Sequence, residues 1–107
     1  MRAKYNNAKT TYDGIVFDSK KEAARYAVLK LLERGSVITD LKLQVKFELA
    51  PSVFFAGRKK PALRYIADFV YTENGRQVIE DVKGMITEVY KIKRHLMIAQ
   101  GYEIKEI

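Results

Sequence analysis

The sequence predicts one mixed α/β domain, with the element order α-β-β-β-α-β and a mixed central sheet flanked by helices. Three observations lead to this prediction. A helix-start pattern lies at Ser19, Asn74-Gly75 separates two alternating segments, and a second helical pattern precedes a short alternating C-terminal segment. The length of 107 residues suits a single domain over 1–107, because it supports one modest core and not two.

The first helix is predicted to begin at Ser19, since Glu22 follows three residues later as in a capping box. Gly35 is expected to end it. Residues 1–14, which are polar and basic, are expected to form a flexible arm or to lie along the surface. The apolar residues assigned to the buried face of the helix are Ala24, Val28, Leu31 and Leu32.

Three strands are predicted in the middle of the chain. Residues 41–49 alternate and end before Pro51. Residues 64–71 and 77–83 flank Asn74-Gly75, a pair that strongly favours a two-residue hairpin turn.

A second helix is predicted over residues 86–99, and Gly101 is expected to end it. Residues 102–107 alternate and are expected to form a final edge strand. The residues with helical spacing that were assigned to this helix's buried face are Val89, Ile92, Leu96 and Ala99.

The composition restricts the possible chemistry. The net charge of +7 favours a polyanionic partner such as nucleic acid, although a basic protein without such a partner has the same balance. The chain has no cysteine and only one histidine, His95, which excludes thiolate and histidine-rich metal sites. Catalysis would therefore use carboxylates, lysine and a hard cation. No segment resembles a signal peptide or a membrane span, so a cytoplasmic protein without membrane contact is expected.

The hairpin decides which acidic residues meet. A two-residue turn pairs Glu73 with Arg76, and counting outward places Asp68 opposite Asp81. Lys83 shares their face because strand side chains alternate, whereas Glu80 lies on the other face. A longer or bulged turn would instead bring Glu80 opposite Asp68.

Two facing carboxylates repel each other, so a divalent cation between them is expected. Mg²⁺ or Mn²⁺ would activate a water for phosphodiester hydrolysis, and a lysine beside it would stabilise the negative charge that develops. The catalytic candidates are Asp68, Asp81 and Lys83. The alternative is an outer face on which both aspartates contact water.

An acidic residue two positions before a lysine is a weak signal, because this chain contains four such triplets. They begin at Asp18, Asp40, Asp81 and Glu103. Only the triplet at Asp81 follows a hairpin whose first strand carries a facing aspartate. That context distinguishes it from the other three.

These residues resemble the PD-(D/E)XK nuclease superfamily, with Asp68 as the first motif element and Asp81-Val-Lys83 as the second. Over nearly the whole chain, four segments resemble a phage and prophage family of small proteins related to Holliday-junction resolvases. They are Phe-Asp-Ser-Lys-Lys-Glu-Ala, Leu-Lys-Leu-Gln, Tyr-Ile-Ala-Asp-Phe and Glu-Asp-Val-Lys-Gly. One departure is that Ala67, and not proline, precedes Asp68. The resemblance implies a restriction-endonuclease-like core and a bacterial or phage-infected host cell.

Two further residues are candidates for the site. The resemblance implies that Glu22 is a helix-borne metal ligand, whereas the capping-box pattern would have it bond the backbone of Ser19. Gln44 is polar within an otherwise alternating apolar strand. It either supports the site or is an ordinary outward-facing strand residue.

Two basic groups are candidates for DNA phosphate contact. The densest cluster is formed by Arg58, Lys59, Lys60 and Arg64, and its alternative role is that of a solubilising loop. On the second helix, Lys91 and Arg94 lie near His95, and the alternative there is a solvated face.

The leading hypothesis is a metal-dependent DNA endonuclease. Selectivity for branched or junction DNA is implied by the resemblance alone. A homodimer is expected if a larger surface is needed. The main alternative is a non-catalytic DNA-binding module with a nuclease-like fold, and an RNA-binding protein is a weaker one because the stacking cues are poor.

Overall fold

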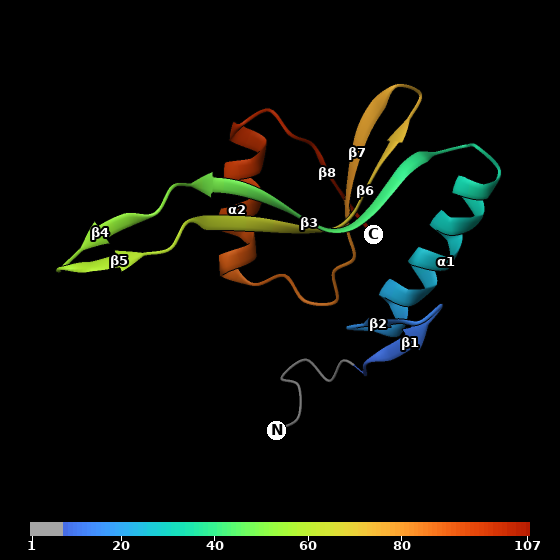
Figure 1. The fold of residues 1–107 in the computed structure, drawn as a ribbon, viewed down its shortest axis with the longest axis horizontal. Coiled ribbons are helices and arrows are strands. Elements are labelled where there is room, and N and C mark those ends of the chain that lie inside the picture. The colour runs from blue at the N-terminus through green and yellow to red at the C-terminus, as the bar shows by residue number, and fades with distance from the viewer. Residues whose placement is uncertain (1–7) are drawn as a thin grey trace.

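The computed structural model of the protein describes residues 8–107. Two helices, a four-stranded sheet and two separate two-stranded hairpins make up the described part of the chain (Figure 1). The elements are β1 (Thr10–Tyr12), β2 (Ile15–Phe17), α1 (Lys20–Arg34), β3 (Thr39–Ala50), β4 (Val53–Phe55), β5 (Arg58–Lys60), β6 (Leu63–Glu73), β7 (Arg76–Asp81), α2 (Glu88–Ala99) and β8 (Ile104–Glu106). Neither described helix is long and apolar enough to cross a membrane.

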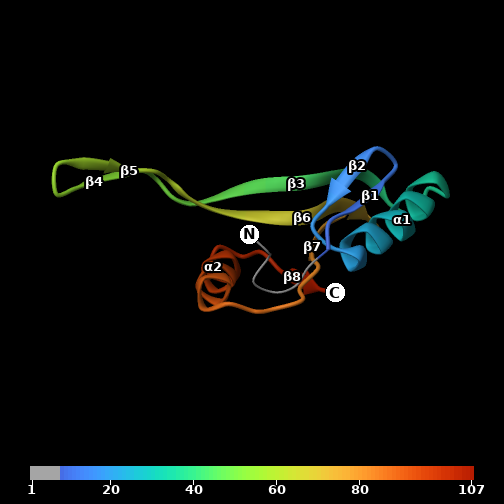
Figure 2. The same cartoon turned by 90° about the horizontal axis from the view of Figure 1, so that it is seen from below.

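The central sheet is mixed and has the strand order β3-β6-β7-β8. The first two pairings are antiparallel, whereas β8 runs parallel to β7. Phe69 packs in a core cluster with α1 residues, and its neighbour Val70 packs in a second cluster with α2 residues. Because successive strand side chains alternate, the two helices cover different faces (Figure 2). The prediction of a mixed α/β domain with two helices and a mixed central sheet is confirmed.

Helix α1 begins where the sequence predicts. The Ser19 side chain accepts a hydrogen bond from the Glu22 backbone N–H at 3.1 Å, which caps the helix. The helix ends at Gly35, and the left-handed backbone conformation is taken by Ser36, with φ of 61°. The predicted buried face is wrong for Ala24, Val28 and Leu31, which are exposed, whereas Leu32 is half-buried against the core cluster. The buried positions are Glu22, Ala23, Tyr26 and Leu29.

The Asn74-Gly75 turn sets the register of β6 and β7 as predicted. Asn74 and Gly75 have φ values of 52° and 74°, which suit a two-residue hairpin turn. Glu73 pairs with Arg76, and Phe69 pairs with Glu80. The second strand is shorter than predicted, because β7 ends at Asp81 and not at Lys83.

Strands β3 and β6 form a long antiparallel hairpin that projects beyond both helices (Figures 1 and 2). At its end, β4 and β5 form their own two-stranded sheet. Residues 58–60, predicted as a loop, are therefore a strand. Ala56 and Gly57 make its turn, with φ values of 53° and 75°.

Helix α2 is capped by Thr87, whose side chain accepts a hydrogen bond from the Tyr90 N–H at 3.1 Å. It buries Tyr90 and Met97. The predicted buried face is wrong here too, since Val89, Ile92 and Ala99 are exposed and Leu96 is half-buried. Strand β8 lies at the edge of the sheet, as predicted.

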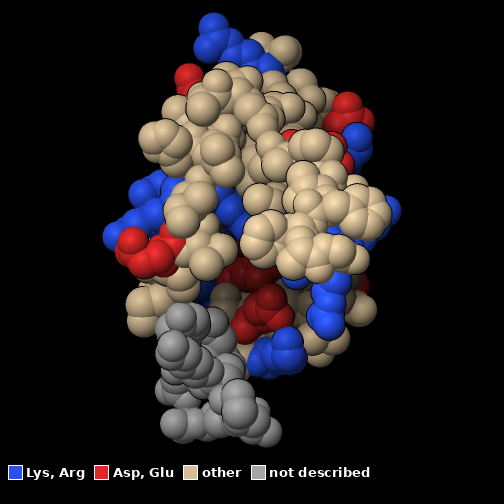
Figure 3. Space-filling model, turned by 90° about the vertical axis from the view of Figure 1, so that its left-hand side faces the viewer, with Lys and Arg blue, Asp and Glu red and all other residues tan. Residues whose placement is uncertain are grey.

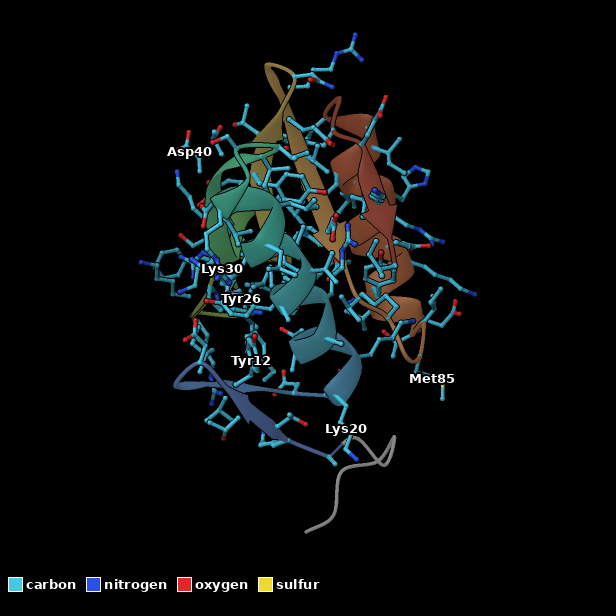
Figure 4. The ribbon with its side chains drawn as sticks, turned by 90° about the vertical axis from the view of Figure 1, so that its right-hand side faces the viewer. Tyr12, Lys20, Tyr26, Lys30, Asp40 and Met85 are labelled. Carbon is cyan, nitrogen blue, oxygen red and sulfur yellow. The ribbon has the colours of Figure 1, made fainter. Side chains whose placement is uncertain are left out.

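A small hairpin of β1 and β2 precedes α1 and was not predicted. Residues 10–12 belong to the segment expected to be a flexible arm, and residues 1–7 of that arm lie outside the described part. Tyr12 meets Tyr26 of α1 edge to face, with ring centroids 6.0 Å apart (Figure 4). Phe17 is buried in the same cluster, so the hairpin extends the core beside α1.

Candidate active site

The register of strands β6 and β7 places Asp68 and Asp81 at neighbouring backbone positions. Since Phe69 pairs with Glu80, the next position outward places Asp68 beside Asp81. The Val82 backbone N–H donates to Asp68 Oδ2 at 2.8 Å, which fixes that carboxylate at the end of β7. Burial raises the pKa of Asp68, while the bonds from Val82 and Gln44 act against it.

Gln44 of β3 joins two carboxylates. Its amide nitrogen lies 3.3 Å from both Glu22 Oε2 and Asp68 Oδ1. Gln44 also has φ of 54°, in the middle of a strand, and a left-handed conformation costs a non-glycine residue about 1–2 kcal/mol. Strain of this kind is concentrated at functional sites, so it supports a site role for Gln44 and not that of an ordinary strand residue.

Glu22 turns toward this amide. The helix cap is formed by the Ser19 side chain, and the Glu22 carboxylate contacts Gln44. Burial, together with the charges of Asp68 and Asp18, raises the pKa of Glu22 to about 7. The charges of Asp68 and Asp18 therefore destabilise the charged form of Glu22 at this point of the fold.

Asp81 is fully buried and only partly satisfied. The Tyr65 hydroxyl donates to its Oδ2, whereas Oδ1 has no hydrogen-bond partner. Lys83 Nζ lies 3.5 Å from Oδ1. Burial raises the pKa of Asp81 to about 6, and the Lys83 charge acts against this rise. An unpartnered buried carboxylate oxygen is costly unless a cation or a donor meets it.

Lys83 is held beside Asp81 by two contacts. One is the ion pair with the carboxylate, and the other is the Tyr90 ring, whose centroid lies 4.2 Å from Nζ. The Lys83 backbone carbonyl also accepts from Lys21 Nζ at 3.4 Å. The lysine is therefore positioned next to the acidic group from the α2 side of the sheet.

Asp18, Glu22 and Asp68 line a pocket of about 350 Å³ that opens to solvent between the start of α1 and the segment after β7. In Figure 4, the label Lys20 identifies the start of α1, and the label Met85 identifies the segment after β7. Figure 3 shows acidic side chains set back in a hollow, with Lys and Arg side chains around it. The residues that line the pocket are Asp18, Ser19, Lys21, Glu22, Asp68, Val82, Lys83, Gly84 and Met85.

Glu80 lies on the opposite face, where Arg25 of α1 holds it. The guanidinium donates to both carboxylate oxygens, at 2.8 and 2.6 Å, and the Tyr71 hydroxyl donates to one of them. Burial acts to raise the pKa of Glu80, but the bonds from Arg25 and Tyr71 outweigh it and lower the pKa. The register thus makes Asp81, and not Glu80, the neighbour of Asp68.

The basic candidates are dispersed. Arg58, Lys59 and Lys60 form β5 at the end of the long hairpin, and Arg64 is exposed nearer its base, on β6. On α2, Lys91 pairs with Glu88 at 3.0 Å, and Arg94 pairs with Glu106 at 2.7 Å beside the Tyr90 ring. Arg94 thus ties α2 to β8, whereas the β5 cations are exposed.

Within residues 8–107, no three Asp, Glu or His side chains lie close enough together to enclose a metal ion. The residues fit an ion held by Asp68 and Asp81, because Mg²⁺ commonly takes one or two carboxylates and completes its shell with water and phosphate oxygens. The unpartnered Asp81 Oδ1 favours such an ion. Glu22 reaches the same pocket, and Gln44 links it to Asp68.

Sequence reasoning missed several residues of this site. Tyr65 and Tyr90, which contact Asp81 and Lys83, give no local sign of their role, because only the twist of β6 and the packing of α2 bring them there. Asp18 begins one of the four acidic triplets, and that pattern could have drawn attention to it. Its charge contributes to the raised pKa of Glu22.

A family model described as "Protein of unknown function (DUF1064)" matches residues 2–107. The chain belongs to this family. No curated protein matches it. The family description names no activity, so the chemistry of the site carries the functional argument.

Proposed function

We propose that this DUF1064 protein is a Mg²⁺- or Mn²⁺-dependent DNA endonuclease with a restriction-endonuclease-like core. The observation that carries the proposal is the buried Asp81 carboxylate, which has one unpartnered oxygen, the Lys83 ammonium 3.5 Å away and Asp68 on the neighbouring strand. Two acids and a lysine at one edge of a hairpin provide the groups that metal-assisted phosphodiester hydrolysis requires.

In this proposal Asp68 and Asp81 would hold the cation, which would supply an acidified water and charge neutralisation for the phosphate. Lys83 stabilises the charge that develops on the phosphate as the water oxygen bonds to phosphorus and one P–O ester bond breaks. The attacking water gives up one proton to solvent, and the departing oxygen takes one up from solvent, so that water is added across the broken P–O bond. Gln44 positions Asp68 by donating to it, and Glu22 supports the same acidic group through Gln44.

DNA is proposed as the substrate because the chain has a net charge of +7 and exposed cations on β5. Branched or junction DNA is included on the basis of the motif resemblance. A homodimer is proposed because two symmetric copies could cut both strands of such a substrate.

The test uses the purified chain with linear, nicked and four-way DNA in Mg²⁺, Mn²⁺ or EDTA. We expect cleavage with either cation and none in EDTA. Asp81→Asn and Lys83→Met should each lower the rate at least about 100-fold, because each removes several kcal/mol of transition-state stabilisation. The dissociation constant for DNA should change less than about threefold.

The chain offers a matched control. Asp40 begins another acidic-x-lysine triplet but is exposed and outside the pocket, so Asp40→Asn should cut DNA at the parent rate. If no substrate is cut with either cation while DNA still binds, the protein is the alternative, a non-catalytic DNA-binding module. Unchanged cleavage by Asp81→Asn would also overturn the proposed site.

A further inference from the structure

The β4–β5 hairpin forms the end of a projecting finger, defined here as residues 51–61. It is a two-stranded sheet of its own, and every residue of β4 and β5 is exposed. In Figures 1 and 2 it extends well beyond both helices. No side chain of β4 or β5 lies in the core. Core packing therefore does not explain which residues the finger contains.

That composition is unusual for an exposed hairpin. Phe54 and Phe55 are 76% and 71% exposed. Two large aromatic side chains that are exposed next to each other indicate an interaction surface, whereas single exposed apolar residues are common on any protein. The hairpin register places Phe54 opposite Lys59 and Phe55 opposite Arg58. Because strand side chains alternate, each face of the finger carries one ring beside one cation.

The finger also lacks compensating charge. It contains three cations and no acidic residue. Among the ion pairs of the described residues, none involves Arg58, Lys59 or Lys60. A partner that fits this surface is a polyanion with flat apolar groups between its charges, which describes a nucleic acid.

We propose that the finger binds DNA, with Phe54 and Phe55 stacking on or inserting between bases while Arg58, Lys59 and Lys60 contact phosphates. A two-stranded ribbon is narrow enough to enter a DNA groove, and apolar side chains inserted at a base step unstack it. The choice of DNA over other nucleic acids rests on the proposed function.

The fold fixes where the finger would reach. Lys60 lies eight residues from Asp68 along the β6 side of the hairpin. At about 3.3 Å per residue this spans at most about 26 Å. With about 3.4 Å per base pair, Lys60 would contact DNA at most about eight base pairs from the phosphate that is bound near Asp68.

The test measures binding in EDTA, where no cleavage is possible, so its outcome is separate from that of the cleavage assay. The probe is a duplex that carries 2-aminopurine at successive positions, which reports unstacking by a rise in fluorescence. The double variant Phe54→Ala/Phe55→Ala should weaken binding about 10- to 100-fold and abolish the fluorescence rise. For this variant, the slope of the logarithm of the DNA-binding constant against the logarithm of the salt concentration should match that of the parent, because the phosphate contacts are unchanged.

Two further variants sharpen the test. Arg58→Met/Lys59→Met/Lys60→Met should reduce the salt slope by about 2 to 3, because each lost phosphate contact releases about one counterion fewer. Val89→Ala/Ile92→Ala removes comparably exposed apolar side chains from α2 and should leave binding unchanged.

The proposal is overturned if the double phenylalanine variant binds DNA within twofold of the parent and changes no 2-aminopurine signal. It is equally overturned if that variant loses binding to vesicles rich in anionic lipid while DNA binding is retained, since the rings would then serve a membrane surface. If no DNA is cleaved but the phenylalanine and cation variants change DNA binding as expected, the proposed nuclease activity is refuted and the proposed DNA binding by the finger is supported.

Discussion

Arg25 of α1 donates hydrogen bonds to both carboxylate oxygens of Glu80, at 2.8 and 2.6 Å. This pair links α1 to β7 on the face of the sheet that α1 covers. The two consecutive acidic residues therefore differ: Arg25 compensates the charge of Glu80, whereas Asp81 Oδ1 has no hydrogen-bond partner and lies 3.5 Å from Lys83 Nζ.

The Arg25–Glu80 pair predicts a stability effect that is independent of catalysis. Arg25→Met should lower the free energy of unfolding by about 3 kcal/mol, since it leaves a buried carboxylate without its cation. Urea denaturation measures this. Lys30→Met removes the solvent-accessible partner of Glu33 and should cost clearly less than Arg25→Met, because water screens this pair. Equal losses in the two variants would show that the buried pair does not hold α1 on the sheet.

The Asn74-Gly75 turn predicts a second stability effect. Gly75 has φ of 74° and open space around it, so Gly75→Ala introduces backbone strain without a clash. We expect a loss of about 1–2 kcal/mol in unfolding free energy. Gly35 has φ of −82°, and an added Cβ there would make only ordinary contacts. Gly35→Ala should therefore lie within about 0.5 kcal/mol of the parent, and a loss as large as that of Gly75→Ala would contradict the turn argument.

The raised pKa of Glu22 predicts a pH dependence in metal-free protein. Burial and the charges of Asp68 and Asp18 raise this pKa from 4.5 to about 7, so the folded state binds the proton more tightly than the unfolded state does. The stability that Glu22 contributes is full below pH 4.5 and is lost as the pH rises through 7.

Glu22→Gln tests this, because glutamine keeps an acceptor for Gln44 without a charge. In EDTA at pH 8 the variant should be more stable than the parent by about 1–2 kcal/mol, and near pH 4.5 the two should be equal. The gain is smaller than the full pKa shift implies, since the pocket is open to water. If Glu22→Gln is less stable than the parent at pH 8, the charged form of Glu22 is not destabilised by burial and by the charges of Asp68 and Asp18.

Cation binding predicts a rise in thermal stability. At a Mg²⁺ concentration ten times its dissociation constant, the folded state gains about 1.4 kcal/mol, or about 5–8 °C in Tm. The rise should be larger at pH 8 than at pH 5, because the carboxylates must lose their protons to bind. Differential scanning fluorimetry at constant ionic strength measures it. Asp68→Asn should remove most of the rise, and a rise of the same size in that variant would place the cation elsewhere.

Local chemistry made parts of the fold predictable. Ser19 caps a helix through its own side chain, and Asn74-Gly75 adopts the backbone conformation that a two-residue hairpin turn requires. Both depend on residues adjacent in sequence. The turn also predicts the register of β6 and β7, and this register alone places Asp68 at the position next to Asp81.

The helix faces were not predictable in this way. Apolar spacing pointed to Val28 and Leu31 in α1 and to Val89 and Ile92 in α2, yet all four are exposed. The buried positions are instead centred on Tyr26 and on Tyr90 with Met97. A small sheet covers only a narrow strip of each helix, so a 107-residue chain leaves many apolar side chains outside the core.

By itself, the sequence determined the helix start at Ser19, the Asn74-Gly75 turn and the pairing of Asp68 with Asp81, because caps and turns act over a few residues. Only the tertiary structure decided the surroundings of those two acids. Gln44 of β3 donates to Asp68, the Tyr65 hydroxyl of β6 donates to Asp81, and Arg25 of α1 binds the carboxylate of Glu80. These contacts join residues 16 to 55 positions apart, and their formation depends on how helices and strands pack, which no local pattern encodes.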